Sequence, residues 1–498
     1  MPDNGIGSWP RRAARIRPAA IALRQDTRAL TYADLADRVD RSARALAARG
    51  IGRGDRIAYL GHNDIAAFVA FFAAGRLGAI FVPLNTRLTP PEVSWLLGDA
   101  APRVLFHGPE HTDLVREVVD GRDIELVASI DDWDPRDTAP PVDPHVIPEI
   151  GGDIGLDDPA VLLYTSGTTG TPKGAVLTHG NLTFNTVNQL AHVDVLAGDI
   201  ALCLAPLFHA TGLGLVSLPT LFKGGTVVVL PRFDPGTVLA TIAELGATAF
   251  SGVPTMLQML CDHPEFERTA LNSLRYVIYG GSAVAERVAL AWQRRGVDIL
   301  HGYGMTEASP GVCLATPEGA TERPVSAGVP HFFTDIALDS ESTTGELLVR
   351  GPNVARGYWR RPDDPAFAPD GSFRSGDVVR VGDDGWIYVI DRIKDVIISG
   401  GENIYPAEVE ARINAVAGVV ECAVVGVPDE RWGEVGMAYV VRTAADAVTE
   451  EQLRDELRNA LAAYKIPRHI RFVDRLARNA AGKIRKQHLR IAPGELEQ

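Results

Sequence analysis

The residues best suited to bind a polyphosphate lie in one short stretch, residues 164–174, which reads Tyr-Thr-Ser-Gly-Thr-Thr-Gly-Thr-Pro-Lys-Gly. Backbone N–H groups, hydroxyl donors and a lysine cation all bind phosphate oxygens, and glycine allows close approach to a ligand. We therefore predict a phosphate-binding loop, although a plain Gly/Thr surface loop has the same composition. Its candidate binding residues are Thr165, Ser166, Gly167, Thr168, Thr169, Gly170 and Lys173.

This stretch departs from the standard P-loop in two ways. Only two residues separate Gly167 from Gly170, and Lys173 is followed by Gly174 instead of the Ser or Thr that holds Mg²⁺ in a P-loop. The spacing argues against a P-loop hydrolase. A carboxylate from elsewhere in the chain is therefore expected to help bind the metal.

Two carboxylates are candidates for contacts to a nucleotide. Glu307 follows a predicted strand in the segment 303–307 and could hold Mg²⁺ together with phosphate oxygens. Asp377 lies in a Ser-Gly-Asp turn and could accept hydrogen bonds from ribose hydroxyls. The alternatives are a solvated loop glutamate and a turn aspartate that bonds its own backbone.

Several other residues are candidates for the site only because the phosphate loop and the two carboxylates are also present. Arg392 could bind ribose or phosphate, and Lys394 could be a residue about which a domain rotates. The alternative for Arg392 is an exposed linker charge. The segment 400–406 could be a simple turn, and Lys483 a surface charge. His209 has apolar neighbours, and a lone histidine there is more often a core residue than a catalyst.

The elements that position these residues follow from the hydrophobic pattern. Strands are predicted at 55–60, 79–83, 104–107, 160–164, 200–204, 226–230, 247–251, 275–279 and 297–300. Helices are predicted at 31–50, 65–75, 90–97 and 235–245. This alternation indicates an α/β fold with largely parallel sheets. Several strands end in glycine, at the carboxyl edge where such sheets bind ligands.

The pattern changes after about residue 328. Short strands at 345–350, 376–381 and 385–390 predict a small antiparallel barrel or sheet. A final piece follows residues 391–395 and is large enough to be a separate domain. It contains predicted strands at 396–399, 420–427 and 437–442 and predicted helices at 406–416 and 450–461. Residues 131–159, rich in Asp and Pro, read as a connecting loop.

Bulk properties narrow the class of protein. The 498 residues are too many for one core. The net charge of −14 disfavours a nucleic-acid-binding role for the whole protein. The four cysteines are far apart, which favours structural thiols in a reducing compartment. No run reaches the roughly 18–20 apolar residues of a membrane span. We expect a cytoplasmic protein without integral membrane association.

Taken in order, these stretches resemble the adenylate-forming superfamily, in particular its branch of acyl-CoA synthetases and fatty-acid–CoA ligases. Residues 165–174 resemble the family's phosphate loop, and 280–282 and 303–307 resemble its adenine and magnesium segments. Residues 345–359 contain its Gly-Glu and Gly-Tyr-Trp landmarks, and 375–377 resemble its ribose aspartate. Residues 391–395, 400–406 and 482–483 resemble the hinge, the thiol-side loop and the adenylation lysine.

The resemblance implies the architecture and the chemistry. An N-terminal domain at 1–391 would carry two α/β subdomains and a small β-barrel, with a hinge at 392–395 and a mobile α+β lid domain at 396–498. A carboxylic acid would attack the α-phosphate of ATP to give acyl-AMP and pyrophosphate, and coenzyme A would then displace AMP. The lid domain would rotate about Lys394 between the two steps.

The resemblance also implies residue roles. ATP and AMP would be bound by Thr165, Ser166, Gly167, Thr168, Thr169, Gly170, Lys173, Gly280, Gly281, Ser282, Gly302, Tyr303, Gly304, Met305, Thr306, Asp377, Arg392 and Lys483. The catalytic set would be Lys483, Glu307, Thr165 and Lys173, with Glu307 and Thr168 at Mg²⁺. Coenzyme A would contact Ser399, Gly400, Gly401 and Glu402. The acyl pocket would include His209, Gly212, Ser251, Gly252, Tyr279 and Gly304.

Departures from the family pattern refine the expected substrate. Gly302 stands where malonate-activating members tend to carry an arginine, which argues against a dicarboxylate. His301 stands where many members have Glu, Asn or Gln, and Ala477 where most have proline. We expect a hydrophobic monocarboxylic acid, fatty or polycyclic/aryl. The alternatives are delivery to a separate carrier protein and a nucleotide-binding protein without turnover, and a homodimer is left open.

Overall fold

The computed structural model describes residues 3–130, 133, 152–165, 172–281, 284, 286–323, 326–399, 402–429, 431–444, 447–478 and 484–490. The chain divides into two compact units. The large unit comprises Met1–Ile336, Val349–Phe373 and Gly385–Ile387, and the small unit comprises Ala337–Leu348, Arg374–Asp384 and Tyr388–Gln498. The expected domain boundary at residue 391 and the hinge at 392–395 stay predictions.

A nine-stranded sheet in the large unit has the order β15-β14-β13-β12-β11-β9-β10-β1-β2. Its strands are β1 (Ile21–Gln25), β2 (Arg28–Thr31), β9 (Ile200–Cys203), β10 (Thr226–Val229), β11 (Ala249–Gly252), β12 (Tyr276–Gly280), β13 (Asp298–Gly304), β14 (Gly311–Leu314) and β15 (Val329–Pro330). The pairs from β1 through β13 are parallel, and β2, β14 and β15 pair antiparallel. The carboxyl ends of β11, β12 and β13 therefore lie at one edge.

A six-stranded sheet has the order β6-β5-β3-β4-β7-β8. Its strands are β3 (Arg56–Leu60), β4 (Ile80–Pro83), β5 (Val104–His107), β6 (Leu126–Ser129), β7 (Pro159–Thr165) and β8 (Lys173–Thr178). The first five strands pair in parallel, and β8 folds back antiparallel on β7. The predicted strand before the phosphate loop is thus one arm of a hairpin.

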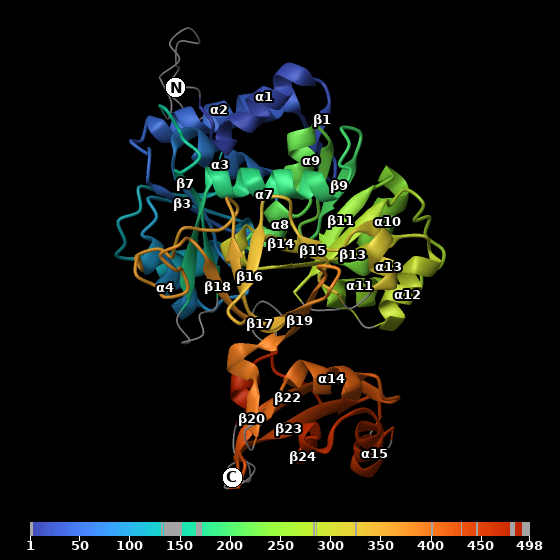
Figure 1. Ribbon diagram of the computed structural model, residues 1–498. Helices are drawn as coiled ribbons and strands as arrows, with labels where there is room; N and C mark the ends of the chain where they lie inside the picture. The colour runs from blue at the N-terminus through green and yellow to red at the C-terminus, as the bar shows by residue number, and fades with distance from the viewer. Residues whose placement is uncertain are drawn as a thin grey trace. The chain divides into compact units, whose positions relative to one another are not determined.

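Helices cover both sheets of the large unit (Figure 1). They are α1 (Trp9–Ile16), α2 (Tyr32–Ala47), α3 (Ile65–Leu77), α4 (Pro90–Ala100), α5 (Thr112–Val119), α7 (His179–His192), α8 (Ala210–Gly214), α9 (Ser217–Lys223), α10 (Pro235–Leu245), α11 (Pro254–Cys261), α12 (Glu286–Arg294) and α13 (Pro317–Glu322). The apolar sides of α10, α11 and α12 share one buried cluster with β9 to β13. None of the described helices is long and apolar enough to cross a bilayer.

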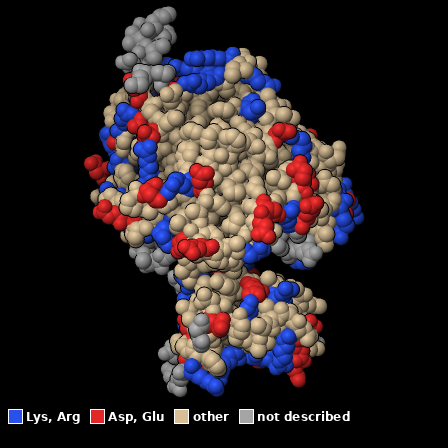
Figure 2. Space-filling model, viewed as in Figure 1, with Lys and Arg blue, Asp and Glu red and all other residues tan. Residues whose placement is uncertain are grey.

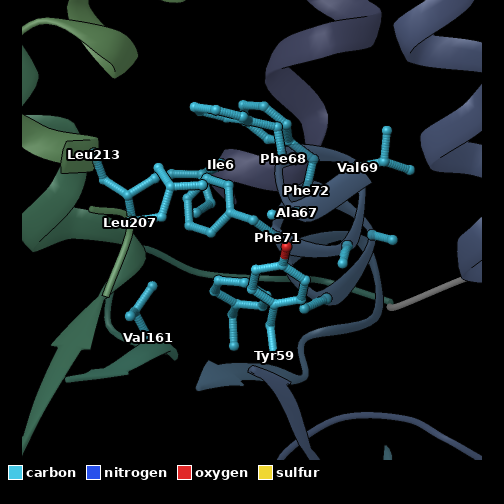
Figure 3. Packing of buried hydrophobic residues seen from close by; sticks show 14 of the residues in the cluster. Ile6, Tyr59, Ala67, Phe68, Val69, Phe71, Phe72, Val161, Leu207 and Leu213 are labelled. Carbon is cyan, nitrogen blue, oxygen red and sulfur yellow. The ribbon is translucent and has the colours of Figure 1, made fainter. Parts of the chain in front are cut away.

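Helix α3 holds the centre of the large unit together. Its aromatic side chains belong to a buried cluster that includes residues of both sheets, such as Leu23 of β1 and Tyr59 of β3. Figure 3 shows Phe71 of α3 beside Tyr59. A helix that is apolar on every side is stable only when it is buried on every side. The side chain of Asp64 caps its first turn, and Gly78 ends it at φ +67°.

The small unit contains most of a four-stranded sheet and a separate five-stranded sheet. The first is formed by β16 (Asp335–Leu338), β17 (Thr344–Arg350), β18 (Phe373–Val381) and β19 (Ile387–Arg392). The second is formed by β20 (Ile397–Ser399), β21 (Glu402–Ile404), β22 (Val419–Asp429), β23 (Gly433–Arg442) and β24 (His469–Phe472). Helices α14 (Pro406–Asn414) and α15 (Glu450–Ala460) pack on the second sheet through a buried cluster.

Candidate active site

The predicted phosphate loop lies at the tip of the β7–β8 hairpin. Thr165 and Lys173 form the last cross-strand pair before the tip, and the Thr165 hydroxyl donates to the Lys173 carbonyl at 3.4 Å. The hairpin therefore places both ends of the loop side by side. The loop candidates Ser166, Gly167, Thr168, Thr169 and Gly170 lie outside the described residues.

Lys173 is held by two partners in the large unit. Its ammonium is 2.7 Å from Asp364 Oδ2 and 4.9 Å from the centre of the Tyr358 ring. Burial alone would raise the pKa of Asp364, but hydrogen bonds from Lys173 and the Ala366 N–H lower it overall. Lys173 is therefore a partly buried cation whose one carboxylate partner among the described residues is Asp364.

Tyr358 links this lysine to the candidate magnesium ligand. Its hydroxyl donates to Glu307 Oε1 at 2.6 Å. Burial and the neighbouring Glu307 carboxylate raise the pKa of Tyr358, so it stays protonated and remains a donor. The other oxygen of Glu307 accepts no hydrogen bond from the described residues. That oxygen fits a hard cation such as Mg²⁺.

Backbone pairing fixes the position of Tyr358. It bridges Ala175 of β8, and the Trp359 N–H donates to the Gly174 carbonyl at 2.7 Å. Glu307 is reached from the end of β13 through a short 3₁₀ turn, Thr306–Ala308, and its carbonyl accepts from the Ala355 N–H at 2.7 Å. The structure thereby brings together Lys173 and Glu307, which are far apart in sequence.

Tyr358 and Asp364 were missed as site residues by sequence reasoning. Tyr358 belongs to the Gly-Tyr-Trp landmark, but the sequence alone does not indicate which residues the tyrosine contacts. Asp364 lies in a Pro- and Asp-rich segment that reads as an ordinary loop. Only the fold of residues 355–364 against β8 and β13 reveals both contacts.

At two of the strand-end positions, close packing against backbone carbonyls leaves room only for glycine. A Cβ on Gly304 would collide with the Pro310 carbonyl, which accepts from the Met305 N–H at 2.9 Å. A Cβ on Gly280 would lie 2.8 Å from the Gly302 carbonyl. Gly281, at φ +96°, is exposed and has nothing within 4 Å of its Cβ position. Of these, Gly281 is the one whose surroundings leave room for a ligand.

The remaining nucleotide candidates of the large unit surround this edge. Gly302 and Tyr303 end β13 beside Gly280, and Met305 and Thr306 lead into the turn that carries Glu307. Ser282 lies outside the described residues.

The acyl-pocket candidates fall at neighbouring strand ends. Ser251 and Gly252 end β11, and Gly252 pairs with Tyr279 on β12. His209 is half-buried at the start of α8. Gly212 follows in that helix, where a Cβ would meet the Pro206 carbonyl.

Tyr279, another acyl-pocket candidate, has a buried ring. The ring stacks on His301, with 4.9 Å between ring centres and 4° between planes. His301 Nδ1 lies 2.9 Å from the Ser326 carbonyl. Burial lowers the pKa of His301 to about 4 despite that hydrogen bond, so the imidazole is neutral at neutral pH. In this structure Tyr279 contributes to the core behind the strand ends.

The ribose candidates meet in the small unit. Arg392 Nε lies 2.9 Å from Asp377 Oδ1, and Asp377 is buried. Asp377 is therefore paired with a distant arginine, and does not bond only the backbone of its own turn. Lys394 is exposed in a 3₁₀ turn, and its carbonyl accepts from Arg490 at 2.8 Å.

The thiol-side candidates are only partly described. Ser399 ends β20 and pairs with Glu402. Gly400, Gly401 and Lys483 lie outside the described residues.

Comparison with known families identifies the class. A family model described as AMP-binding enzyme matches residues 10–359, and a second, described as AMP-binding enzyme C-terminal domain, matches residues 408–483. The chain therefore belongs to the family of AMP-binding enzymes.

Individual relatives match nearly the whole chain. A feruloyl-CoA synthase of Amycolatopsis sp is 48% identical, over 98% of this chain and 99% of the relative. An indoleacetate–CoA ligase of Aromatoleum aromaticum is 38% identical over 97% of each chain. Among solved structures, an O-succinylbenzoate coenzyme A synthetase of Bacillus subtilis in complex with ATP and magnesium ion has a TM-score of 0.88 and 32% identity, over 97% of this chain and 99% of that chain.

These findings confirm the predicted family and the multi-sheet α/β fold with a separate C-terminal sheet. They also confirm the predicted enzyme class, an AMP-forming acid–thiol ligase that uses ATP, Mg²⁺ and coenzyme A.

Proposed function

We propose that the acid activated by this enzyme is an aromatic monocarboxylic acid of the arylpropenoic or arylacetic kind. Support comes from relatives named for feruloyl-CoA and indoleacetate, which match this chain over almost its full length. Gly302 agrees with a monocarboxylate, because an arginine at that place would suit a second carboxylate.

In the proposed reaction, a carboxylate oxygen of the acid attacks the α-phosphorus of ATP, and the bond from that phosphorus to the bridging oxygen breaks. Pyrophosphate leaves with both bonding electrons. The thiol sulfur of coenzyme A then attacks the acyl carbon, the thiol proton is released, and AMP departs. Such steps depend on positioning and on stabilisation of developing charge.

For the adenylation step, the observation that carries the proposal is the contact of Lys173 with Tyr358 and of Tyr358 with Glu307. The Lys173 ammonium lies 4.9 Å from the centre of the Tyr358 ring, and the hydroxyl of the same tyrosine donates to Glu307, so one residue contacts both the candidate phosphate-binding cation and the candidate Mg²⁺ ligand. We assign Lys173 and the loop residues to the leaving pyrophosphate, with Thr165 fixing the start of the loop. Glu307 holds Mg²⁺ with Thr168, and Tyr358 orients Glu307.

The small unit supplies the remaining roles in this proposal. Asp377 accepts from the ribose hydroxyls, and Arg392 holds that carboxylate in place. Lys483 neutralises charge on the acid and the α-phosphate during adenylation. Lys394 is the residue about which the lid rotates, and residues 399–402 contact coenzyme A.

A substrate panel tests the choice of acid. Pyrophosphate release is measured with hydroxycinnamic, arylacetic, benzoic, medium-chain and long-chain fatty acids, each with and without coenzyme A. We expect the highest kcat/KM with an arylpropenoic or arylacetic acid, and thioester formation only when coenzyme A is present. A preference for long-chain fatty acids would contradict the aromatic assignment. Acyl transfer only to a phosphopantetheinyl carrier protein would favour the alternative acceptor.

Two finer proposals concern the setting of the enzyme. We propose that it works in the cytoplasm, in agreement with four free cysteines, of which three are buried.

We also propose that the enzyme forms a homodimer through a surface that includes the neighbouring residues Phe332 and Phe333, which are 74% and 39% exposed. Light scattering of Phe332→Ser beside the wild type tests it, and a wild-type monomer at micromolar concentration contradicts it.

A further inference from the structure

Two histidines and a glutamate outside the nucleotide site lie together at the carboxyl edge of the six-stranded sheet. His62 follows β3, and Glu110 and His111 end a 3₁₀ turn, Pro109–His111, that follows β5. β3 and β5 are parallel neighbours with Leu60 opposite His107. The two turns therefore meet in space although they are far apart in the chain.

The distances among the three side chains suit a small metal ion. Glu110 Oε1 lies 3.5 Å from His62 Nε2 and 3.6 Å from His111 Nε2, and the three ligand atoms lie within 4.8 Å of one another. Tetrahedral zinc, with bonds of about 2.0–2.1 Å to nitrogen and oxygen, separates its ligand atoms by roughly 3.3 Å. Two edges of the triangle already match, and rotation of an imidazole closes the third.

The surrounding backbone holds this arrangement in place. The His62 N–H donates to Glu110 Oε1 at 3.4 Å, and the Tyr59 hydroxyl donates to the His62 carbonyl at 2.6 Å. The Glu110 carboxylate occupies the space where a Cβ on Gly108 would lie. Glycine at 108 is therefore needed for the carboxylate to reach the two histidines.

Within the described part of the chain, His111 Nε2 is buried without a hydrogen-bond partner. Without a partner, this nitrogen loses its hydrogen bonds to water on folding and gains none in return. A bound cation would supply the missing partner.

We propose that His62, Glu110 and His111 bind Zn²⁺, with water as the fourth ligand, at a site separate from that of the catalytic Mg²⁺. Two imidazole nitrogens and one carboxylate favour zinc, whereas Mg²⁺ prefers oxygen ligands. The ion ties the turn after β3 to the turn after β5. Arg232 competes with it, because its Nε lies 3.0 Å from His62 Nε2. That side chain is exposed and free to swing away when zinc binds.

The first test is calorimetric titration of ZnCl₂ into the full-length chain after treatment with a chelator. We expect one site per chain, and Glu110→Gln and His111→Ala should each weaken it by more than about tenfold. His263→Ala, a histidine outside the cluster, is the matched control and should bind like the wild type. Pyrophosphate release should be unchanged in all three variants. Wild-type zinc affinity in both cluster variants would overturn the proposal.

The second test uses Arg232 and remains informative if a cluster variant folds poorly. Arg232→Gln removes the competing cation without removing a ligand, so zinc should bind several-fold more tightly. Unchanged or weaker binding would contradict a site at His62 Nε2. Co²⁺ in place of zinc should give the strong visible absorption of a tetrahedral site in the wild type and in Arg232→Gln. The same absorption in Glu110→Gln would likewise overturn the proposal.

Discussion

Lys173 has Asp364 and the Tyr358 ring as partners, and these contacts explain how a lysine without a neighbouring P-loop hydroxyl can serve a phosphate site. In the proposed site, the Asp364 carboxylate would hold the ammonium in one position until a polyphosphate replaces it. Glu307 accepts from the hydroxyl of the same tyrosine. Tyr358 would thus link the proposed phosphate-binding lysine to the proposed metal ligand, a link that a P-loop makes through the Ser or Thr after its lysine.

Removal of the Glu307 charge tests the assigned metal ligand. Glu307→Gln keeps the size and a hydrogen-bond acceptor for Tyr358 but loses the negative charge. Because positioned charges at the reacting phosphates are worth about 10²–10³ in rate, we expect a loss of that order in pyrophosphate release, together with a higher Mg²⁺ requirement. Glu322→Gln, an exposed glutamate of the same unit, is the control. Wild-type Mg²⁺ dependence in Glu307→Gln would remove Glu307 from the metal site.

Tyr358→Phe separates the two contacts of the tyrosine. The ring remains for Lys173, while the hydrogen bond to Glu307 is lost. A hydrogen bond to a charged group contributes about 1.5–3 kcal/mol to stability, so we expect the free energy of unfolding to fall by about that amount. Because Glu307 would also lose the group that orients it, we expect a lower kcat/KM for ATP and a higher Mg²⁺ requirement. Tyr388→Phe on β19 is the matched control. An unchanged Mg²⁺ requirement in Tyr358→Phe would argue against the orienting role.

At the scale of elements, the strand ends decide whether the site residues meet. Gly304 allows β13 to approach the Pro310 carbonyl, and the turn that carries Glu307 starts directly after it. Gly304→Ala should therefore lower the free energy of unfolding by about 1–3 kcal/mol through overpacking.

Denaturant unfolding measures this effect, and Gly302→Ala is the control. At Gly302 a Cβ would make ordinary contacts of 3.5 Å or more, so the loss should be smaller. Equal losses in the two variants would mean that the Pro310 contact does not constrain β13.

Most elements were predictable because their hydrophobic pattern and end signals agree. The predicted helix at 31–50 begins with the Thr31–Asp34 capping box, and the strand at 104–107 is β5. Strand β8 was not predicted, because the glycine and lysine at its start read as part of the loop. Helix α7 was also missed, since many of its buried residues are polar, including Asn185, Asn188 and Gln189. The Asn185 and Asn188 side chains donate to the Gly214 carbonyl and the Thr334 hydroxyl, tertiary hydrogen bonds that a sequence pattern does not reveal.

At the scale of the whole molecule, the surface mixes charges of both signs. On the face drawn in Figure 2, Lys and Arg side chains gather along the upper edge of the large unit, Asp and Glu lie mainly toward its sides and lower edge, and its centre carries few charges.

Three buried histidines make the stability of the large unit depend on pH. Burial lowers the pKa of His179 and His301 to about 4 and that of His331 to about 3. Between their ordinary pKa near 6.5 and these values, only the unfolded chain is protonated. Stability is therefore full above pH 6.5 and falls as the pH is lowered, by at most about 1.4 kcal/mol per pH unit for each histidine.

Denaturant midpoints at pH 7.5, 6 and 5, at fixed ionic strength, measure this dependence. His301→Gln, a residue type found at this place in the family, should reduce the slope. A slope that is zero in the wild type, or unchanged in the variant, would contradict neutral burial of His301.

The central claim is that the enzyme adenylates an acid and then transfers it, and that Lys483 serves only the first step. The most direct measurement compares the two half-reactions in Lys483→Ala, with Lys223→Ala, an exposed lysine of the large unit, as the control. We predict that Lys483→Ala abolishes pyrophosphate release from ATP and acid but still converts supplied acyl-adenylate and coenzyme A to thioester and AMP. Survival of both half-reactions, or loss of both, would contradict the account.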